Sequence, residues 1–269
     1  MNHPGRRGGA DWKFALIGGL SNQSARRIFT AAEFHRFVQD YRPGASASTA
    51  RSVADMLVSA GALRRVSSGL FLNSRTVPPA ELTEVAAHIR SGAVISLHSV
   101  LGECGFLNNP SAIVVAVLPT SSTKRPNLGD VETSSGNKFR FFGLAEKFFP
   151  MTLEERWEML QPGRQCEMFR PEAALLQWLY LASIQRSTLT MPPVDVDMEQ
   201  LDEELLGRLA ERWGVGRQLN DWLDQAQTAN FGEETEMARS PAPVVPTQDV
   251  LDKSAAARAR LMSRRASSL

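Results

Sequence analysis

Two stretches of the chain carry residue types whose spacing suits a chemical task. The first combines small hydroxyl side chains with arginine between residues 46 and 68, and such side chains can bond phosphates or the edges of DNA bases. Its members are Ser46, Ser48, Thr49, Arg51, Ser52, Arg64, Arg65, Ser67 and Ser68. The second is a run of carboxylates between residues 195 and 204, a residue type that can bind Mg²⁺. The first stretch suits recognition of a polyanion, and the second raises the question of metal-assisted catalysis.

The carboxylate run is better explained by helix formation than by a metal site. Its members are Asp195, Asp197, Glu199, Asp202, Glu203 and Glu204, which follow two prolines. Acids are favoured in the first turn of a helix because the helix dipole is positive there. A nucleotidyltransferase would instead hold Mg²⁺ with an Asp-x-Asp pair on a strand shortly after a Gly-Ser turn. We therefore expect no metal at this run.

Other arrangements for catalysis are equally weak in this sequence. The four histidines are scattered, and Cys104 and Cys166 do not form a C-x-x-C pair. Residues 121–124 have an S-x-x-K spacing without its companion motifs, and neither G-x-S-x-G nor a P-loop is present. We therefore expect a protein that is not an enzyme and needs no cofactor. An enzyme that uses the carboxylates at 195–204 stays an alternative, for which Mg²⁺-dependent nucleotide turnover is the test.

Composition predicts a soluble, cytoplasmic protein. The chain has 269 residues, of which 43% are hydrophobic, enough to fill a sizeable core. No apolar run reaches the ~20 residues that a membrane helix needs, and we expect no membrane association. Two cysteines are too few for a disulfide framework, which favours a reducing compartment.

Charge is divided unevenly along the chain. Residues 1–75 contain eleven Lys or Arg against four Asp or Glu, and residues 76–250 contain 14 against 24. Residues 251–269 contain five against one, so the three net charges are +7, −10 and +4. A basic end joined to an acidic body indicates that one end meets a polyanion, which would repel the body.

The basic block, residues 1–75, has the element order of a winged helix-turn-helix. We expect a helix over about 12–17 and a second that begins at Thr30, where Glu33 completes a capping box. A third helix, capped by Ser46 or Ser48, should end near residue 61. Two short apolar segments at 62–66 and 70–72 then predict a hairpin.

In this fold the third helix enters the major groove, and its first residues reach base edges. Arg51 is the side chain there that could grip a guanine bidentately, and Arg64 and Arg65 on the hairpin, the wing, would contact phosphates or the minor groove. Taken one at a time, these residues could equally be solvated strand positions, and Ser48 and Thr49 could simply cap a helix. Together, on a block with surplus positive charge, they favour binding of double-stranded DNA.

The fold class expected for the chain is α+β, with the winged helix-turn-helix followed by a mixed α/β domain over 76–230. Strands are expected near 93–95, 113–118, 131–134 and 138–143, and helices at about 80–90, 96–105, 173–182 and 198–227. After residue 231 periodicity is lost and prolines become frequent, which predicts a disordered basic tail over 231–269.

Three segments, in this order, resemble the AbiEi-type antitoxins of type IV toxin–antitoxin systems. They are FTAAEF at 29–34 with STARSVADMLVSAGALRRVSSGLF at 48–71, VISLHSVLGECGF at 94–106, and MFRPEAALLQWLYL at 168–181. The resemblance covers about residues 12–227, and the extension past 231 is longer than the family pattern needs. The wing turn at 66–69 also lacks a third basic residue.

The resemblance implies a winged-helix domain that binds inverted repeats in its own promoter and represses the operon. It also implies an α/β domain that counteracts a cognate nucleotidyltransferase-like toxin without a stable complex. By motif, the recognition-helix and wing roles carry over to Ser48, Thr49, Arg51, Arg64 and Arg65. Pro171 and Glu172 carry over only as motif positions. The alternative is a winged-helix regulator without an antitoxin role, whose acidic domain binds a ligand or a partner.

Overall fold

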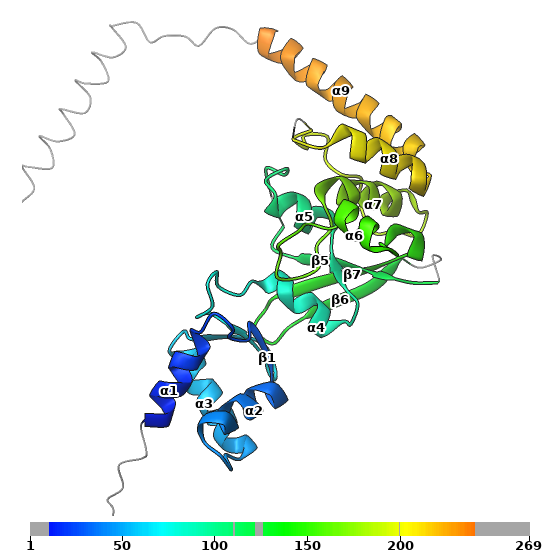
Figure 1. Cartoon of the computed structure of the whole chain (residues 1–269). Coiled ribbons are helices and arrows are strands. Elements are labelled where there is room, and N and C mark those ends of the chain that lie inside the picture. Colours follow the sequence, from blue (N-terminus) through cyan, green and yellow to red (C-terminus); the bar gives the residue numbers. More distant parts are fainter. Residues whose placement is uncertain (1–10, 110, 122–125, 199, 240–269) are drawn as a thin grey trace, which may run out of the picture. The chain divides into compact units, whose positions relative to one another are not determined.

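The computed structural model describes residues 11–109, 111–121, 126–198 and 200–239, and this part of the chain has a mixed α+β fold (Figure 1). Its α-helices are α1 Asp11–Leu20, α2 Ala31–Tyr41, α3 Ala47–Ser59, α4 Ala86–Ile89, α5 Leu97–Glu103, α6 Leu153–Met159, α7 Pro171–Ser183, α8 Glu203–Trp213 and α9 Gly216–Arg239. Short 3₁₀ turns are η1 Leu82–Val85 and η2 Glu146–Phe148. Its strands are β1 Ile28–Thr30, β2 Leu63–Ser67, β3 Leu70–Asn73, β4 Val94–Ile95, β5 Val114–Pro119, β6 Asn127–Glu132 and β7 Lys138–Leu144.

The first three helices begin where local chemistry predicts. Thr30 accepts a hydrogen bond from the Glu33 backbone N–H at 3.3 Å, and the Glu33 carboxylate accepts one from the Thr30 N–H at 2.9 Å. This confirms the predicted capping box of α2. Ser46 is the N-cap of α3. Gly44, with φ of +78°, supplies the left-handed turn that separates α2 from α3.

The predicted hairpin is the β2–β3 pair, and a third strand, β1, completes an antiparallel sheet of order β1-β3-β2. Sequence reasoning missed β1 because three residues are too few to show a period of two. Pairing with β3 places β1 beside the hairpin, directly before the N-cap of α2.

Both faces of this small sheet are buried, each in a different hydrophobic cluster. Phe29, Leu63 and Phe71 pack with the helices of the first block, whose other large core residues are Leu16, Leu20, Phe34, Val38, Val53 and Leu57. The residues that point the opposite way are Ile28, Val66, Leu70 and Leu72, and they belong to the cluster that fills the body of the chain. Because side chains alternate along a strand, one face of the sheet packs in the core of the first block and the other face packs in the core of the body.

The body is built around a four-stranded mixed sheet of order β4-β5-β7-β6. Strands β5 and β7 run parallel, while β4 and β6 pair antiparallel at the two edges. Helix α5 packs on both β5 and α7, and α7 packs on α8. Pro171 stands in the first turn of α7, as predicted, and Trp178 is buried in the body cluster.

Two expectations for the C-terminal part are wrong. The single helix predicted over 198–227 is two helices, because Gly214 adopts a left-handed conformation (φ +69°) that ends α8 before α9 begins. Helix α9 also continues to Arg239, past residue 231, where the sequence predicts a disordered tail to begin. The remainder of that predicted tail, 240–269, lies outside the described residues.

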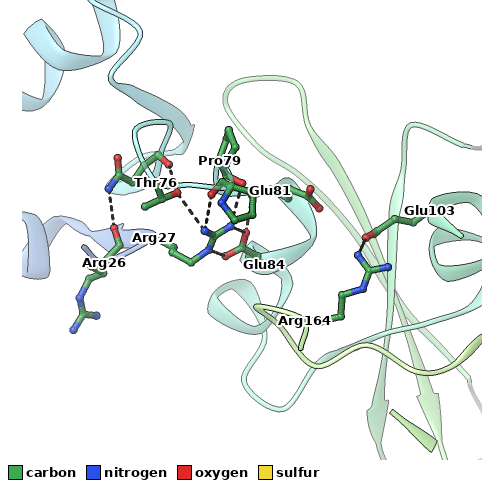
Figure 2. A network of polar contacts seen from close by, with 10 residues as sticks. Arg26, Arg27, Thr76, Pro79, Glu81, Glu84, Glu103 and Arg164 are labelled. Carbon is green, nitrogen blue, oxygen red and sulfur yellow. Dashed lines mark hydrogen bonds and ion pairs between the residues drawn. The ribbon is translucent and has the colours of Figure 1, made fainter. Parts of the chain in front are cut away.

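A buried ion pair links the first block to the segment that leads into the body (Figure 2). The Arg27 guanidinium donates to both carboxylate oxygens of Glu84 at 2.7 Å, and these side chains are 18% and 5% exposed. Further bonds run to the carbonyls of Pro78 (2.7 Å) and Pro79 (3.0 Å) and to the Thr76 hydroxyl (3.3 Å). The Glu84 carboxylate raises the pKa of Arg27, so the guanidinium stays charged despite its burial.

Glu84→Gln should lower the free energy of unfolding by about 3 kcal/mol, because a buried guanidinium would lose its counter-charge. The matched control is Glu132→Gln, which breaks the exposed 3.7 Å pair with Lys138 and should cost under about 1 kcal/mol. Urea titration of both variants checks this. Equal, small losses in the two variants would show that the Arg27 network is not a structural support.

Candidate nucleic-acid interface

The first turns of α3 carry most of the predicted DNA-binding residues. Ala50, Val53, Ala54 and Leu57 are buried against the first-block core, so the helical period turns Ser48, Arg51 and Ser52 toward solvent. Thr49 is half-buried. The structure therefore brings the sequence-predicted helix residues together on one exposed surface.

The hydroxyl groups at the start of α3 are tied to the helix itself. Ser46 Oγ accepts from the Thr49 backbone N–H at 3.2 Å and lies 2.8 Å from Ser48 Oγ and 3.0 Å from Thr49 Oγ1. Ser52 Oγ donates to the Ser48 carbonyl at 3.1 Å. Ser46 thus has a structural task as the N-cap, while Ser48 and Ser52 stay exposed for contacts with a ligand.

Arg51 differs from the other arginines of this surface. It is exposed and makes no hydrogen bond or ion pair with any described residue. It lines a groove of about 520 Å³ together with Ala47 from its own helix, Ala31 from α2, and Arg65 and Ser68 from the hairpin. An unpaired guanidinium at the edge of a groove is available for a bidentate contact.

The hairpin arginines, in contrast, are both engaged. Arg65 forms an ion pair with Asp55 of α3, and its guanidinium carbon lies 5.2 Å from the Phe71 ring centroid. Arg64 Nη2 donates to Asn137 Oδ1 at 2.9 Å. The sequence predicts free contacts to phosphate from these side chains, and each would have to exchange its present partner first.

The hairpin turn is also held by the body. Ser135 Oγ donates to the Val66 carbonyl at 2.6 Å, and Val66 itself is fully buried in the body cluster. Ser67 is half-buried beside a register shift between Arg65 and Ser67, and Ser68 is exposed. Of the two predicted hairpin serines, Ser68 is thus the better placed for a ligand.

Sequence reasoning missed the role of Asp55. It follows Arg51 by one helical turn and brings a negative charge to the surface on which Arg51 lies. The signal was available, because an acid on a helix predicted to meet DNA is unfavourable unless it pairs with a cation. Arg65 is that cation.

The carboxylate run contains no metal site in the part of the chain that the structure describes. Asp202 is the N-cap of α8 and accepts from the Leu205 N–H at 2.9 Å, with Glu203 and Glu204 in the first turn. Asp195 accepts from Asn108 Nδ2 at 2.9 Å. Glu199 and the Lys124 end of the S-x-x-K spacing lie outside the described residues.

The two cysteines are free thiols, and burial raises the pKa of each, that of Cys166 to about 11. At neutral pH both are therefore protonated, the less nucleophilic form. Among the described residues, none of the helices has the length and apolar character that crossing a membrane requires.

His98 is a packed histidine. Its ring meets that of Trp178 edge-on, with centroids 5.6 Å apart. Burial, with a smaller contribution from the positive charge of Arg140, lowers the pKa of His98 to about 4, although a hydrogen bond with the Ile113 backbone opposes the shift. The imidazole is therefore neutral in the folded protein at pH 7.

Comparisons with known proteins leave the family of this chain open. No protein-family model matches it, and no curated protein matches it. A solved structure that is similar to it is entitled "Crystal structure of RV2827C protein from Mycobacterium tuberculosis", with 14% sequence identity and a TM-score of 0.47. The likeness covers 80% of this chain and 77% of that chain, and at this level it assigns no function.

His98→Asn should remove a pH-dependent part of the stability. The unfolded histidine binds a proton below about pH 6.5 and the folded one below about pH 4, so acid favours unfolding between these values. From pH 7 to pH 5 the wild type should lose about 2 kcal/mol more unfolding free energy than the variant. Urea titrations at the two pH values check this, with exposed His88→Asn as the control. Identical losses in wild type and His98→Asn would contradict it.

Proposed function

We propose that residues 1–75 form a winged helix-turn-helix that binds double-stranded DNA, with α3 as the recognition helix. The observation that carries this proposal is the exposed first half of α3, on which Arg51 has no partner among the described residues. That surface belongs to the block with a net charge of +7. An exposed guanidinium on a basic, hydroxyl-rich helix suits guanine recognition in a major groove.

The elements around Arg51 also support α3 as the recognition helix. The groove beside Arg51 is bordered by the beginnings of α2 and α3 and by the hairpin turn, so one surface offers helix ends, hydroxyls and two arginines. Helix N-termini and Arg65, once released from Asp55, suit phosphates. The acidic body would be repelled by the same duplex, which orients the chain with its basic block toward DNA.

We propose further that the chain is a DNA-binding antitoxin of the AbiEi type that represses its own operon. In this proposal the body, residues 76–230, counteracts a nucleotidyltransferase-like toxin without a stable complex. The support is the order of the three sequence segments that resemble the family. We assign no catalytic role to the chain.

Growth rescue tests the antitoxin role. The chain is co-expressed with the protein encoded by the adjacent gene, with and without residues 1–75. Rescue of growth by the full chain is expected, and rescue by the body alone would place the antitoxic activity there. Failure of the full chain to rescue growth, while it still binds its upstream DNA, would leave a regulator without an antitoxin role.

That regulator is the second candidate function, and one observation favours it. The body contains a cavity of about 310 Å³ beside His98 and Trp178, which could accept a small ligand.

Arg51→Ala should reduce discrimination between DNA sequences. Loss of one bidentate base contact should weaken binding to the upstream operator by about 1–3 kcal/mol and leave binding to an unrelated duplex nearly unchanged. Fluorescence anisotropy with both duplexes measures the difference. Arg217→Ala, which removes a 90% exposed arginine from α9, is the control. Equal affinity of Arg51→Ala and wild type for the operator would contradict the assignment of α3.

Asp55→Asn should strengthen binding to all duplexes, because it removes a negative charge and frees Arg65 for a phosphate. The slope of log affinity against log salt should steepen by about 0.9, the value for one more neutralised phosphate. Salt titrations by anisotropy measure this slope. Asp40→Asn on α2 is the matched control, and a wild-type slope for Asp55→Asn would show that Arg65 does not reach the backbone.

A further inference from the structure

The body contains a cavity that the DNA-binding proposal does not use. Its volume is about 310 Å³, and its lining comes from α5, β7, α7 and the segments 107–109, 111–113 and 193–195. Small-molecule sites usually measure about 300–1,000 Å³, so this cavity suits a ligand of few heavy atoms.

One side of the cavity is apolar and already ordered. Trp178 is 6% exposed, and its indole N–H donates to the Thr190 carbonyl at 2.8 Å, which fixes the ring. Leu107, Ile113 and Pro193 complete this side. A ligand gains apolar contact here without ordering the wall first.

Two opposite charges border the same space. Arg140 uses Nε and Nη2 in a fork to Asp130, at 2.8 and 2.6 Å, and its Nη1 has no partner among the described residues. Asp195 uses Oδ2 to accept from Asn108, and its Oδ1 has no such partner. One free donor group and one free acceptor oxygen therefore remain.

The rim that carries Asp195 is also preformed. The Asp197 backbone N–H donates to the Phe106 carbonyl at 3.3 Å, next to the 2.9 Å bond between Asn108 and Asp195. These two bonds hold the segment 195–197 beside the segment 106–108. Asp195 is exposed, and its bond to Asn108 holds the carboxylate at the cavity edge.

His98, the remaining titratable residue of the lining, adds no charge at pH 7. Its Nε2 is buried without a hydrogen-bond partner among the described residues. An anionic ligand would be repelled by Asp195, and a ligand without an anionic group would leave the free Nη1 of Arg140 without an acceptor. A ligand with one charge of each sign satisfies both.

We propose that this cavity binds an α-amino acid with an apolar side chain. Its carboxylate pairs with Arg140, its ammonium group pairs with Asp195, and its side chain lies against Trp178, Leu107 and Ile113. The site is separate from α3, so it does not depend on DNA binding.

Isothermal titration calorimetry of the full chain tests this assignment, with leucine and phenylalanine as probes. At least one should bind with a Kd of about 1 mM or tighter. Isoamylamine and isocaproate, which each lack one of the two charged groups of leucine, should bind at least about tenfold more weakly than leucine.

Asp195→Asn keeps an oxygen that can accept from Asn108 and removes the charge. It should weaken amino-acid binding at least about tenfold, whereas Asp221→Asn on α9, whose carboxylate is 62% exposed, should bind like wild type. Absence of binding by both amino acids, equal binding of isoamylamine or isocaproate and leucine, or unchanged affinity in Asp195→Asn would each overturn the proposal. Circular dichroism of each variant confirms that it is folded.

Discussion

The structure depends on one small sheet that is buried on both faces. Phe29 and Phe71 point into the core of the first block, while Val66 and Leu72 point into the core of the body. A shift of the strand register by one residue would turn each of these side chains to the opposite face and disrupt the packing of both cores. The hairpin therefore packs against both cores. The bonds between Arg27 and Glu84 connect the first block to the segment that follows the hairpin. The β2–β3 hairpin is packed on both faces, unlike a hairpin that projects into solvent.

Because the hairpin is packed on both faces, its arginines and Arg51 would contribute differently to the proposed DNA surface. Because the hairpin arginines are bound to Asp55 and Asn137, their contribution to DNA binding requires an exchange of partners. Arg51 needs no such exchange. Specificity should therefore come mainly from α3, and the hairpin should add affinity that varies with salt. In the proposed complex, the net charge of −10 over residues 76–250 would keep the acidic part of the chain away from the duplex.

Local chemistry predicted much of the fold, and long-range contacts account for most of what it missed. The capping box of Thr30 and Glu33 and the position of Pro171 follow from neighbours in sequence, and both are confirmed. The pairing of β1 with β3 and the ion pair of Arg27 with Glu84 depend on residues brought together by folding, which no spacing reveals. The exposed face of α3 was predictable from its apolar period. The apolar pattern of the sequence continues from α8 into α9, so it did not reveal that Gly214 ends the first of these helices.

Site-directed cross-linking from α3 to operator DNA tests the central claim most directly. Ser48→Cys places a reactive thiol on the exposed face of α3, and Ser183→Cys places one on the exposed last residue of α7 in the body. With a photoactivatable group on the thiol, Ser48→Cys should form adducts with bases inside the protected operator, in a pattern that follows the major groove. Ser183→Cys should form far fewer adducts with bases. If the Ser48→Cys protein binds the operator and forms no adduct with a base, α3 is not the recognition helix.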